Sequence, residues 1–210
     1  KSYGALMHSD TVQTVGHFPI DLKEIPVDMI SASAHKIYGP KGIGFLFLRS
    51  NIKVEPFVIG GAQERNMRGG TENTIGIAAL HKALQVNMEN MDSEKDHILS
   101  IKNYMKEQLR ASFPEVQFNG LSGDDEQSLY TVLSVGLPQW KDDNMFLFNM
   151  DLHGIAISGG SACASGSNQG SHVIKEVLPE ATYPVVRFSF GKDNTKAHVD
   201  RVIEVLKEIH

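Results

Sequence analysis

The first third of the chain alternates short apolar runs with polar or glycine-containing turns. The runs cover residues 5–10, 27–35 and 42–48, and each is bounded by polar groups, proline or glycine. Apolar runs of this length are typical of buried strands. The pattern therefore predicts strands in these three places.

After the glycine pair at residues 60 and 61, the apolar residues recur with helical spacing. Residues 71–91 fit a helix with Thr71 as its N-cap. Residues 93–113 fit a second helix, whose apolar stripe holds Ile98, Ile101, Met105 and Leu109. We therefore expect two consecutive helices.

The second half of the chain contains both strand-like and helix-like patterns of apolar residues. Residues 116–118, 130–137 and 185–191 predict strands, and residues 143–154 predict a helix that ends at Gly154. Residues 195–210 predict an amphipathic helix with an apolar stripe of Val199, Val202, Ile203, Leu206 and Ile209. Mixed helices and strands indicate an α/β or α+β chain.

A change of structural unit is expected near residues 85–95, where strand–turn alternation gives way to long helices. The length of 210 residues suits one large domain or two small ones. We place the boundary between residues 90 and 91, giving domains 1–90 and 91–210.

Composition excludes several classes of function. The net charge is −5 and the basic residues form no run, so we predict no direct nucleic-acid partner. No apolar stretch reaches the length of a membrane span, which predicts no membrane partner. The start of the chain has no signal-like pattern and no initiator methionine, so we expect a fragment or a processed product. The single cysteine excludes an internal disulfide, and the nine histidines lack metal-site spacing, so we expect no metal.

Lys36 follows a predicted strand in the stretch SASAHKIYGPKGIGF. Alternation along that strand places Ser31, Ser33 and His35 on one face, where hydroxyls and an imidazole suit an anion such as phosphate. A lysine in a desolvated place becomes an amine nucleophile. An ordinary solvated lysine is the simpler interpretation, and this stretch alone favours it.

Asp10 and Gln13 lie in HSDTVQ, at the end of another predicted strand. Ligands of open α/β sheets bind at such strand ends, and an aspartate there can pair with a protonated ring nitrogen of a cofactor. A turn-capping aspartate explains Asp10 equally well.

Two glycine-rich stretches carry further candidates. GGAQERNMRGGTEN, residues 60–73, holds Arg65, Arg68 and Thr71 before a helix start, which suits either an anion site or a surface loop. SGGSACASGSNQGS, residues 158–171, surrounds Cys163 with small polar residues. We expect an exposed, mobile loop and an accessible thiol suited to nucleophilic or sulfur-exchange chemistry.

Arg187 lies in the apolar stretch VVRFSFG. Alternation places Arg187 and Ser189 on one face and Val186, Phe188 and Phe190 on the other. An arginine there needs an anion, either a bound carboxylate or an internal Asp or Glu.

Five motifs in order resemble those of the NifS/IscS-type cysteine desulfurases, which are class V aminotransferase-like enzymes of pyridoxal 5′-phosphate (PLP) fold type I. They are HSDTVQ, SASAHKIYGPKGIG, GGAQERNMRGGT, SGGSACASGS and RFSFG. Ala62, Gly70 and Ala164 depart from the family pattern by small-for-small changes.

The resemblance implies a role for each matching residue. Lys36 would bind PLP covalently and move protons, while Asp10 pairs with the ring nitrogen and Gln13 with the phenolic oxygen. Ser33 and His35 would hold the phosphate, with Thr71 reaching it from the partner subunit of a homodimer. Arg187 would bind the substrate carboxylate, and Cys163 would take sulfur from L-cysteine as a persulfide.

The resemblance covers only the C-terminal part of the family. It implies the end of the large mixed-sheet PLP domain (1–90) followed by an α+β small domain (91–210). The upstream half, which supplies further PLP contacts in the family, is absent, so we expect the chain alone to bind PLP poorly.

Three functions remain open at this point. The first is a cysteine desulfurase that delivers sulfur to an acceptor protein, as in iron–sulfur cluster or thio-cofactor assembly. The second is another class V enzyme, such as an aminotransferase or selenocysteine lyase, although the cysteine loop argues against it. The third is an inactive fragment that serves only in dimerisation or acceptor docking. The cytoplasm is the expected location, with an organelle as the alternative.

Overall fold

The computed structural model describes residues 3–141, 143–159 and 171–210. The chain forms two compact units, residues 1–92 and 93–210. The functional assignment of the two predicted domains, with their boundary between residues 90 and 91, stays a prediction.

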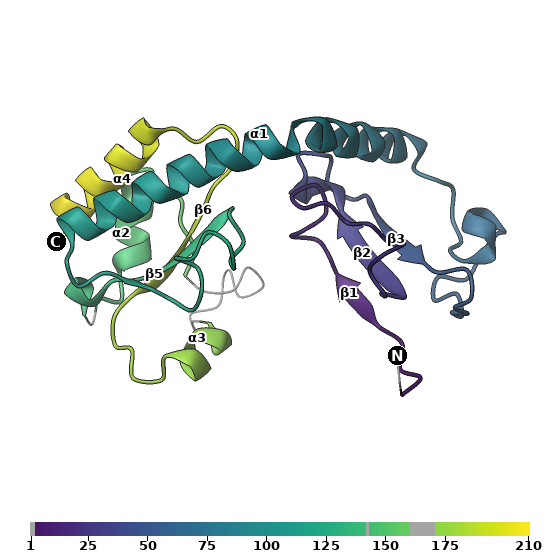
Figure 1. The fold of residues 1–210 in the computed structure, drawn as a ribbon, viewed down its shortest axis with the longest axis horizontal. Helices are drawn as coiled ribbons and strands as arrows, with labels where there is room; N and C mark the ends of the chain where they lie inside the picture. Colours follow the sequence, from purple (N-terminus) through teal and green to yellow (C-terminus); the bar gives the residue numbers. More distant parts are fainter. Residues whose placement is uncertain (1–2, 142, 160–170) are drawn as a thin grey trace. The chain divides into compact units, whose positions relative to one another are not determined.

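The first unit is built on a three-stranded sheet with the order β1-β2-β3 (Figure 1). The strands are β1 (His8–Asp10), β2 (Met29–Ser33) and β3 (Gly44–Leu48), all inside the runs predicted as strands. β1 pairs with β2 in parallel, and β2 pairs with β3 in antiparallel. β2 is therefore the central strand, and β1 and β2 have their carboxyl ends on the same side of the sheet.

Arg49 fixes the segment that leads into β2. Its Nε donates to the Val27 carbonyl at 2.6 Å, and its Nη2 donates to the carbonyls of Leu22 and Ile25 at 2.6 and 2.8 Å. A guanidinium suits this task because its donors form a rigid planar fork.

Helix α1 (Thr74–Ser112) is one helix of 39 residues, whereas the sequence pattern predicted two. The prediction of a break near residue 92 was wrong. The stretch NMENMDSEKD at this place contains neither glycine nor proline, and no other residue there ends a helix strongly.

The prediction that Thr71 caps this helix was also wrong. The side chain of Asn73 accepts a hydrogen bond from the Gly76 N–H at 2.9 Å, which is the N-cap contact. Thr71 lies two residues before it and is exposed. Asparagine and threonine are both good caps, so the local pattern did not distinguish them.

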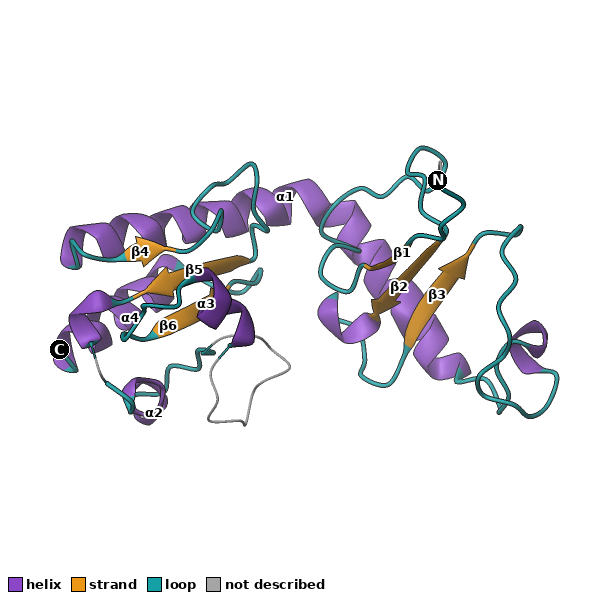
Figure 2. Ribbon diagram, turned by 90° about the horizontal axis from the view of Figure 1, so that it is seen from below, coloured by secondary structure: helices purple, strands orange, loops and turns teal. Residues whose placement is uncertain are grey.

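The second unit contains an antiparallel sheet with the order β4-β5-β6 (Figure 2). Its strands are β4 (Gln117–Phe118), β5 (Val132–Gly136) and β6 (Val185–Ser189). Besides the second half of α1, the described residues of this unit form the α-helices α2 (Phe146–Leu152), α3 (His172–Val177) and α4 (Lys196–Glu208). The short helix α3 was not predicted, because six residues are too few for a clear helical period.

Helix α4 lies along the second half of α1 (Figure 1). Tyr104 donates to Asp200 at 2.7 Å, and His97 contacts the Asn194 carbonyl at 2.9 Å. The predicted stripe of α4 is buried at Val199, Val202, Ile203 and Leu206. The core of the unit thus lies between these helices and the sheet.

Helix α2 ends as the sequence predicted, at Gly154. This glycine has φ +75°, its N–H donates to the Asp151 carbonyl, and the Ile155 N–H donates to the Met150 carbonyl. The two bonds form a Schellman motif, whose left-handed residue favours glycine.

Candidate functional site

Lys36 lies on a short 3₁₀ turn, η1 (Ala34–Lys36), that directly follows the central strand β2. Ala34, which is fully buried, accepts hydrogen bonds from the N–H groups of Ile37 and Gly39 at 3.0 and 2.8 Å. Its own N–H donates to the Ile43 carbonyl at 3.0 Å. The turn is therefore held from both sides, and it presents the half-buried Lys36 at a defined place.

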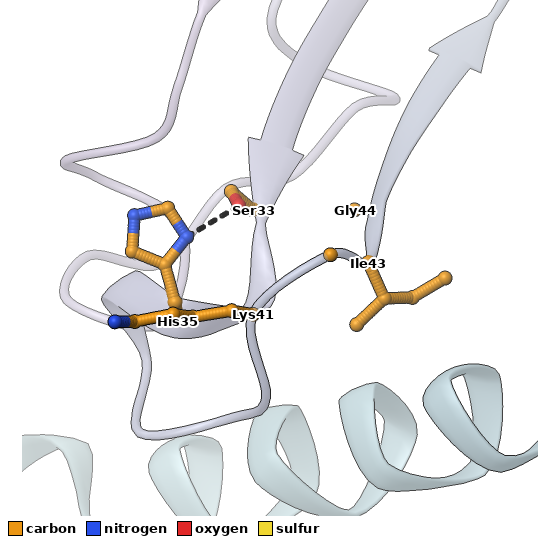
Figure 3. Close-up of a pocket in the computed structure, with 6 residues that line it drawn as sticks. Ser33, His35, Lys41, Ile43 and Gly44 are labelled. Carbon is orange, nitrogen blue, oxygen red and sulfur yellow. Dashed lines mark hydrogen bonds between the residues drawn. The ribbon is translucent and has the colours of Figure 1, made fainter.

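Ser33 and His35 meet, although not for the reason that the sequence pattern gave. Alternation assigned both to one face of a strand, but β2 ends at Ser33 and His35 belongs to the 3₁₀ turn. The turn brings the imidazole Nδ1 to 2.8 Å from the Ser33 hydroxyl, in hydrogen-bond contact (Figure 3). The shared strand face was therefore wrong for His35, and the 3₁₀ turn brings the two side chains together instead.

These two side chains open onto a recess of about 460 Å³. The residues that line it are Ser33, His35, Lys41, Gly42, Ile43 and Gly44. None of them carries a carboxylate, whereas a hydroxyl, an imidazole and an ammonium are present. Such a set suits an oxyanion such as a phosphate, which binds donors and positive charge.

Gly44 brings the wall of this recess close to β2. Its backbone pairs with Ser33, and an added Cβ would overlap the Ala32 carbonyl oxygen. Only glycine therefore fits at the start of β3 without displacing the end of β2.

Asp10 lies at the carboxyl end of β1, opposite Ser31 of β2 in the parallel pair. Its Oδ1 accepts a hydrogen bond from the Val12 N–H at 3.0 Å. Asp10 therefore caps the turn, which was the second interpretation of this residue. Within the described part of the chain, its second oxygen forms no hydrogen bond. Gln13, three residues on, is exposed. Asp10 and Gln13 thus lie at or just after the carboxyl end of β1, on the same side of the sheet as the carboxyl end of β2, where Ser33 and Lys36 lie.

Thr71 lies after a loop with an unusual backbone. Glu64, Arg65 and Asn66 have φ of 46°, 58° and 64°, a left-handed turn that non-glycine residues rarely adopt. The loop closes through the Gly69 N–H, which donates to the Val58 carbonyl at 2.8 Å. Thr71 is exposed and does not line the recess of Ser33 and His35, so within the described part of the chain the structure does not bring it together with them.

Arg187 belongs to the second unit, on β6. The predicted faces are confirmed, because Val186, Phe188 and Phe190 are buried while Ser189 is exposed. Among the described residues, no Asp or Glu forms an ion pair with Arg187, and its buried Nε has no hydrogen-bond partner. The sequence left two anions open for Arg187, a bound carboxylate or an internal Asp or Glu. The described residues do not supply the second.

Cys163 and its neighbours from residue 160 to 170 lie outside the described residues. The expectations of a mobile loop and an accessible thiol therefore stay predictions.

Asn87 is a residue of this site that the sequence analysis missed. Its buried side chain donates from Nδ2 to the carbonyls of Ile37 and Ala83, both at 2.8 Å. The first bond fixes the residue directly after Lys36. A signal was present, because Asn87 lies on the same helical stripe as Leu80, Leu84 and Met91.

The described residues contain neither a metal-binding cluster nor a membrane-spanning helix. No group of three or more His, Cys, Asp or Glu side chains there could hold a metal ion. No helix in the same residues has both the length and the apolar character of a membrane span.

Comparison with known proteins places these features in a family. The pattern of the family described as Aminotransferase class-V matches residues 1–202. The cysteine desulfurase IscS of Clostridium botulinum is 38% identical over 211 residues, which cover 100% of this chain and 53% of that protein. A cysteine desulfurase of Nostoc sp. is also 38% identical, with 52% of that protein covered.

Solved structures agree with the sequence matches. A NifS-like protein superimposes with a TM-score of 0.84 at 29% identity, covering 100% of this chain and 53% of the other. The NifS-like protein from Rickettsia africae gives a TM-score of 0.83 at 30% identity, covering 99% and 54%. These matches confirm the predicted resemblance and the predicted α/β class, that of the PLP-dependent transferase fold.

The chain spans about half the length of the curated relatives that it matches. The match to the family pattern covers residues 1–202 of the 210 residues of this chain. The chain belongs to the class-V aminotransferase family, and over its whole length it is similar to the NifS/IscS-type cysteine desulfurases of that family.

Proposed function

We propose that this chain is part of a PLP-dependent cysteine desulfurase, which converts L-cysteine to L-alanine and transfers the sulfur to Cys163. The observation that carries the proposal is the Ser33–His35 contact of 2.8 Å, directly before Lys36 on a fixed turn. The names of the relatives support the same reaction.

The residues of the first unit fit PLP. The cofactor combines a phosphate with an aldehyde, so it needs an anion site next to an amine. Ser33 and His35 line a recess without carboxylates, and Lys36 follows them immediately. PLP, when bound, supplies an electron sink for the chemistry at the substrate.

Each predicted residue has a role in the proposal. Lys36 binds the cofactor and moves protons at its Nζ, and Asp10 and Gln13 bind the ring from the end of β1. Ser33 and His35 hold the phosphate. Thr71 joins them from the partner subunit of a homodimer, which agrees with its separation from them in the single chain. Arg187 binds the substrate carboxylate through a guanidinium that lacks a described acidic partner.

The sulfur transfer balances without an added oxidant. The substrate loses its thiol sulfur and gains a proton on carbon, which gives alanine. Cys163 changes from a thiol to a persulfide, which stores the sulfur in the oxidation state that an acceptor protein takes over. We propose an iron–sulfur or thio-cofactor assembly protein as that acceptor, and the cytoplasm as the location of the enzyme.

The test of the cofactor site is the visible spectrum with added PLP, followed by borohydride reduction and peptide mapping by mass spectrometry. We expect a reduced adduct on Lys36 in the full-length protein and none in Lys36→Ala. An adduct on another lysine, or no adduct in the full-length protein, would contradict the proposal.

The test of the reaction is the variant Cys163→Ala in the same protein. We expect it to keep the Lys36 adduct and to lose sulfide release from L-cysteine almost completely. Unchanged sulfide release in this variant would contradict sulfur transfer to Cys163 and favour a lyase such as a selenocysteine lyase. Absence of sulfide release in the unchanged protein would favour an aminotransferase, because transamination leaves the carbon–sulfur bond intact and needs no loop thiol.

A further inference from the structure

Lys41 shares the recess of Ser33 and His35 but has no role in the proposal so far. It lies in the turn Gly39–Gly42 that joins η1 to β3. Gly42 has φ +79°, a left-handed value that lets the chain reverse there and lead into β3. After this turn the chain runs back beside the end of β2. Lys41 therefore lies at the recess and lines it.

The Lys41 side chain is directed at the imidazole side of the recess. Figure 3 shows it extended toward the side where the His35 ring lies, while Ile43 points the opposite way. Its ammonium forms no ion pair or hydrogen bond with the described residues, so its charge is free for a ligand.

The charge of the phosphate explains why a cationic group is needed in the recess. A phosphate monoester carries a charge of about −1.5 to −2 near neutral pH. The Ser33 hydroxyl is neutral, so it cannot balance this charge by itself. Lys41 is the one residue in this lining with an ammonium group, because Ser33, Gly42, Ile43 and Gly44 have no charged side chain and His35 carries an imidazole.

We propose that Lys41 is a further phosphate-binding residue of the cofactor site, which adds the positive charge of its ammonium beside Ser33 and His35. The inference rests on the proposed function for the identity of the phosphate, which is that of PLP. The recess is lined by residues of this chain, so its affinity for phosphate can be tested without the cofactor.

The first experiment titrates the 210-residue chain with inorganic phosphate and follows the amide signals of Gly42 and Gly44 and the ring signals of His35 by NMR. Sodium chloride at matched ionic strength is the reference. We expect phosphate to shift these signals, and Lys41→Ala to weaken the apparent affinity about fivefold. Lys41→Arg should retain most of the affinity, because it keeps the charge at the same place.

Lys53→Ala is the matched control, since it removes the same charge from an exposed position of the same unit that does not line the recess. We expect this variant to bind phosphate as the unchanged chain does. The inference is overturned if phosphate shifts no signal in the recess, if Lys41→Ala binds as tightly as the unchanged chain, or if Lys53→Ala loses as much affinity.

The second experiment separates this inference from the proposed function. In the full-length protein, PLP and pyridoxal, which lacks the phosphate, are compared by the yield of reduced adduct on Lys36. We expect Lys41→Ala to lower the preference for PLP over pyridoxal about fivefold and to leave the pyridoxal adduct unchanged. An unchanged preference overturns the role of Lys41, whereas absence of any Lys36 adduct overturns the proposed function and leaves the phosphate titration to decide on Lys41.

Discussion

At the scale of single residues, the turn that carries Lys36 depends on contacts from outside it. The Asn87 amide reaches the Ile37 carbonyl across 50 residues of sequence. A buried carbonyl without a partner loses its hydration and gains nothing in exchange. The position of Lys36 is therefore set partly by helix α1.

This contact makes Asn87→Ala a test of the turn. We expect it to lower the free energy of unfolding by about 1–3 kcal/mol, because the Ile37 carbonyl stays buried without its donor. Urea denaturation of the full chain measures the effect. Gln85→Ala is the control, since Gln85 forms only exposed hydrogen bonds, with Lys82 and Glu89, and should lower the free energy of unfolding by about 0.2–0.5 kcal/mol per pair. Equal effects of the two variants would show that the Asn87 contact does not stabilise the turn.

At the scale of elements, α1 extends over residues 74–112 without interruption. Its continuity can be tested at Asp92, an exposed position in the middle. Proline there removes a backbone N–H and clashes with the preceding turn, at a cost of about 3 kcal/mol or more. We expect Asp92→Pro to lose helical signal in far-ultraviolet circular dichroism, while Asp92→Ala keeps it. Equal signals in the two variants would mean that two separate helices meet at this place.

The second half of α1 also holds a buried lysine. Lys102 is fully buried and donates to the Ser128 hydroxyl at 2.9 Å and the Leu129 carbonyl at 3.3 Å. Desolvation lowers the pKa of Lys102 from its ordinary value of 10.5, against the attraction of Asp125, which raises it. The adjacent Lys106 forms an ion pair with Asp125 at 2.8 Å, and this contact lowers the pKa of that carboxyl against the opposing effect of its burial.

A lowered lysine pKa predicts a sign for the pH dependence of stability. Between the folded-state pKa and 10.5, the unfolded chain binds more protons than the folded chain, so stability rises with pH in that window. Lys102→Met has no such group. We expect the stability of the unchanged chain to increase relative to this variant as pH rises toward 10.5, measured by urea denaturation at a series of pH values. A constant difference would show that burial does not perturb Lys102.

At the scale of the whole molecule, the first unit exposes several large apolar side chains near its sheet. Leu6 and Met7, which precede β1, are 58% and 56% exposed, and Leu46 of β3 is 57% exposed. β1 is also an edge strand with unpaired backbone groups on one side among the described residues. Such an edge is a site for pairing with a further segment.

These exposures agree with a chain that spans half of its relatives. We predict that the chain alone binds PLP poorly and that a complementing upstream half restores binding. The measurement is the yield of reduced Lys36 adduct with the two halves mixed or produced together, compared with each half alone. A complementing half that failed to raise the yield would contradict this prediction.

The sequence by itself determined the elements and the motif residues. Apolar runs predicted the strands of both sheets, alternation predicted the faces of β6 around Arg187, and Gly154 predicted the end of α2. These features depend on neighbours within a few residues, which is the range over which a sequence pattern acts. The five motifs predicted the family for the same reason, since each is a short local stretch.

Only the tertiary structure decided how these pieces meet. The 3₁₀ turn, and not strand alternation, brings His35 to Ser33, and the return of the chain at Gly42 adds Lys41 to their recess. Asn87 fixes the turn from a helix far along the chain, while α1 continues through the place where a break was predicted. Such contacts join residues far apart in sequence, and their partners are set by backbone geometry and burial, which no local pattern contains.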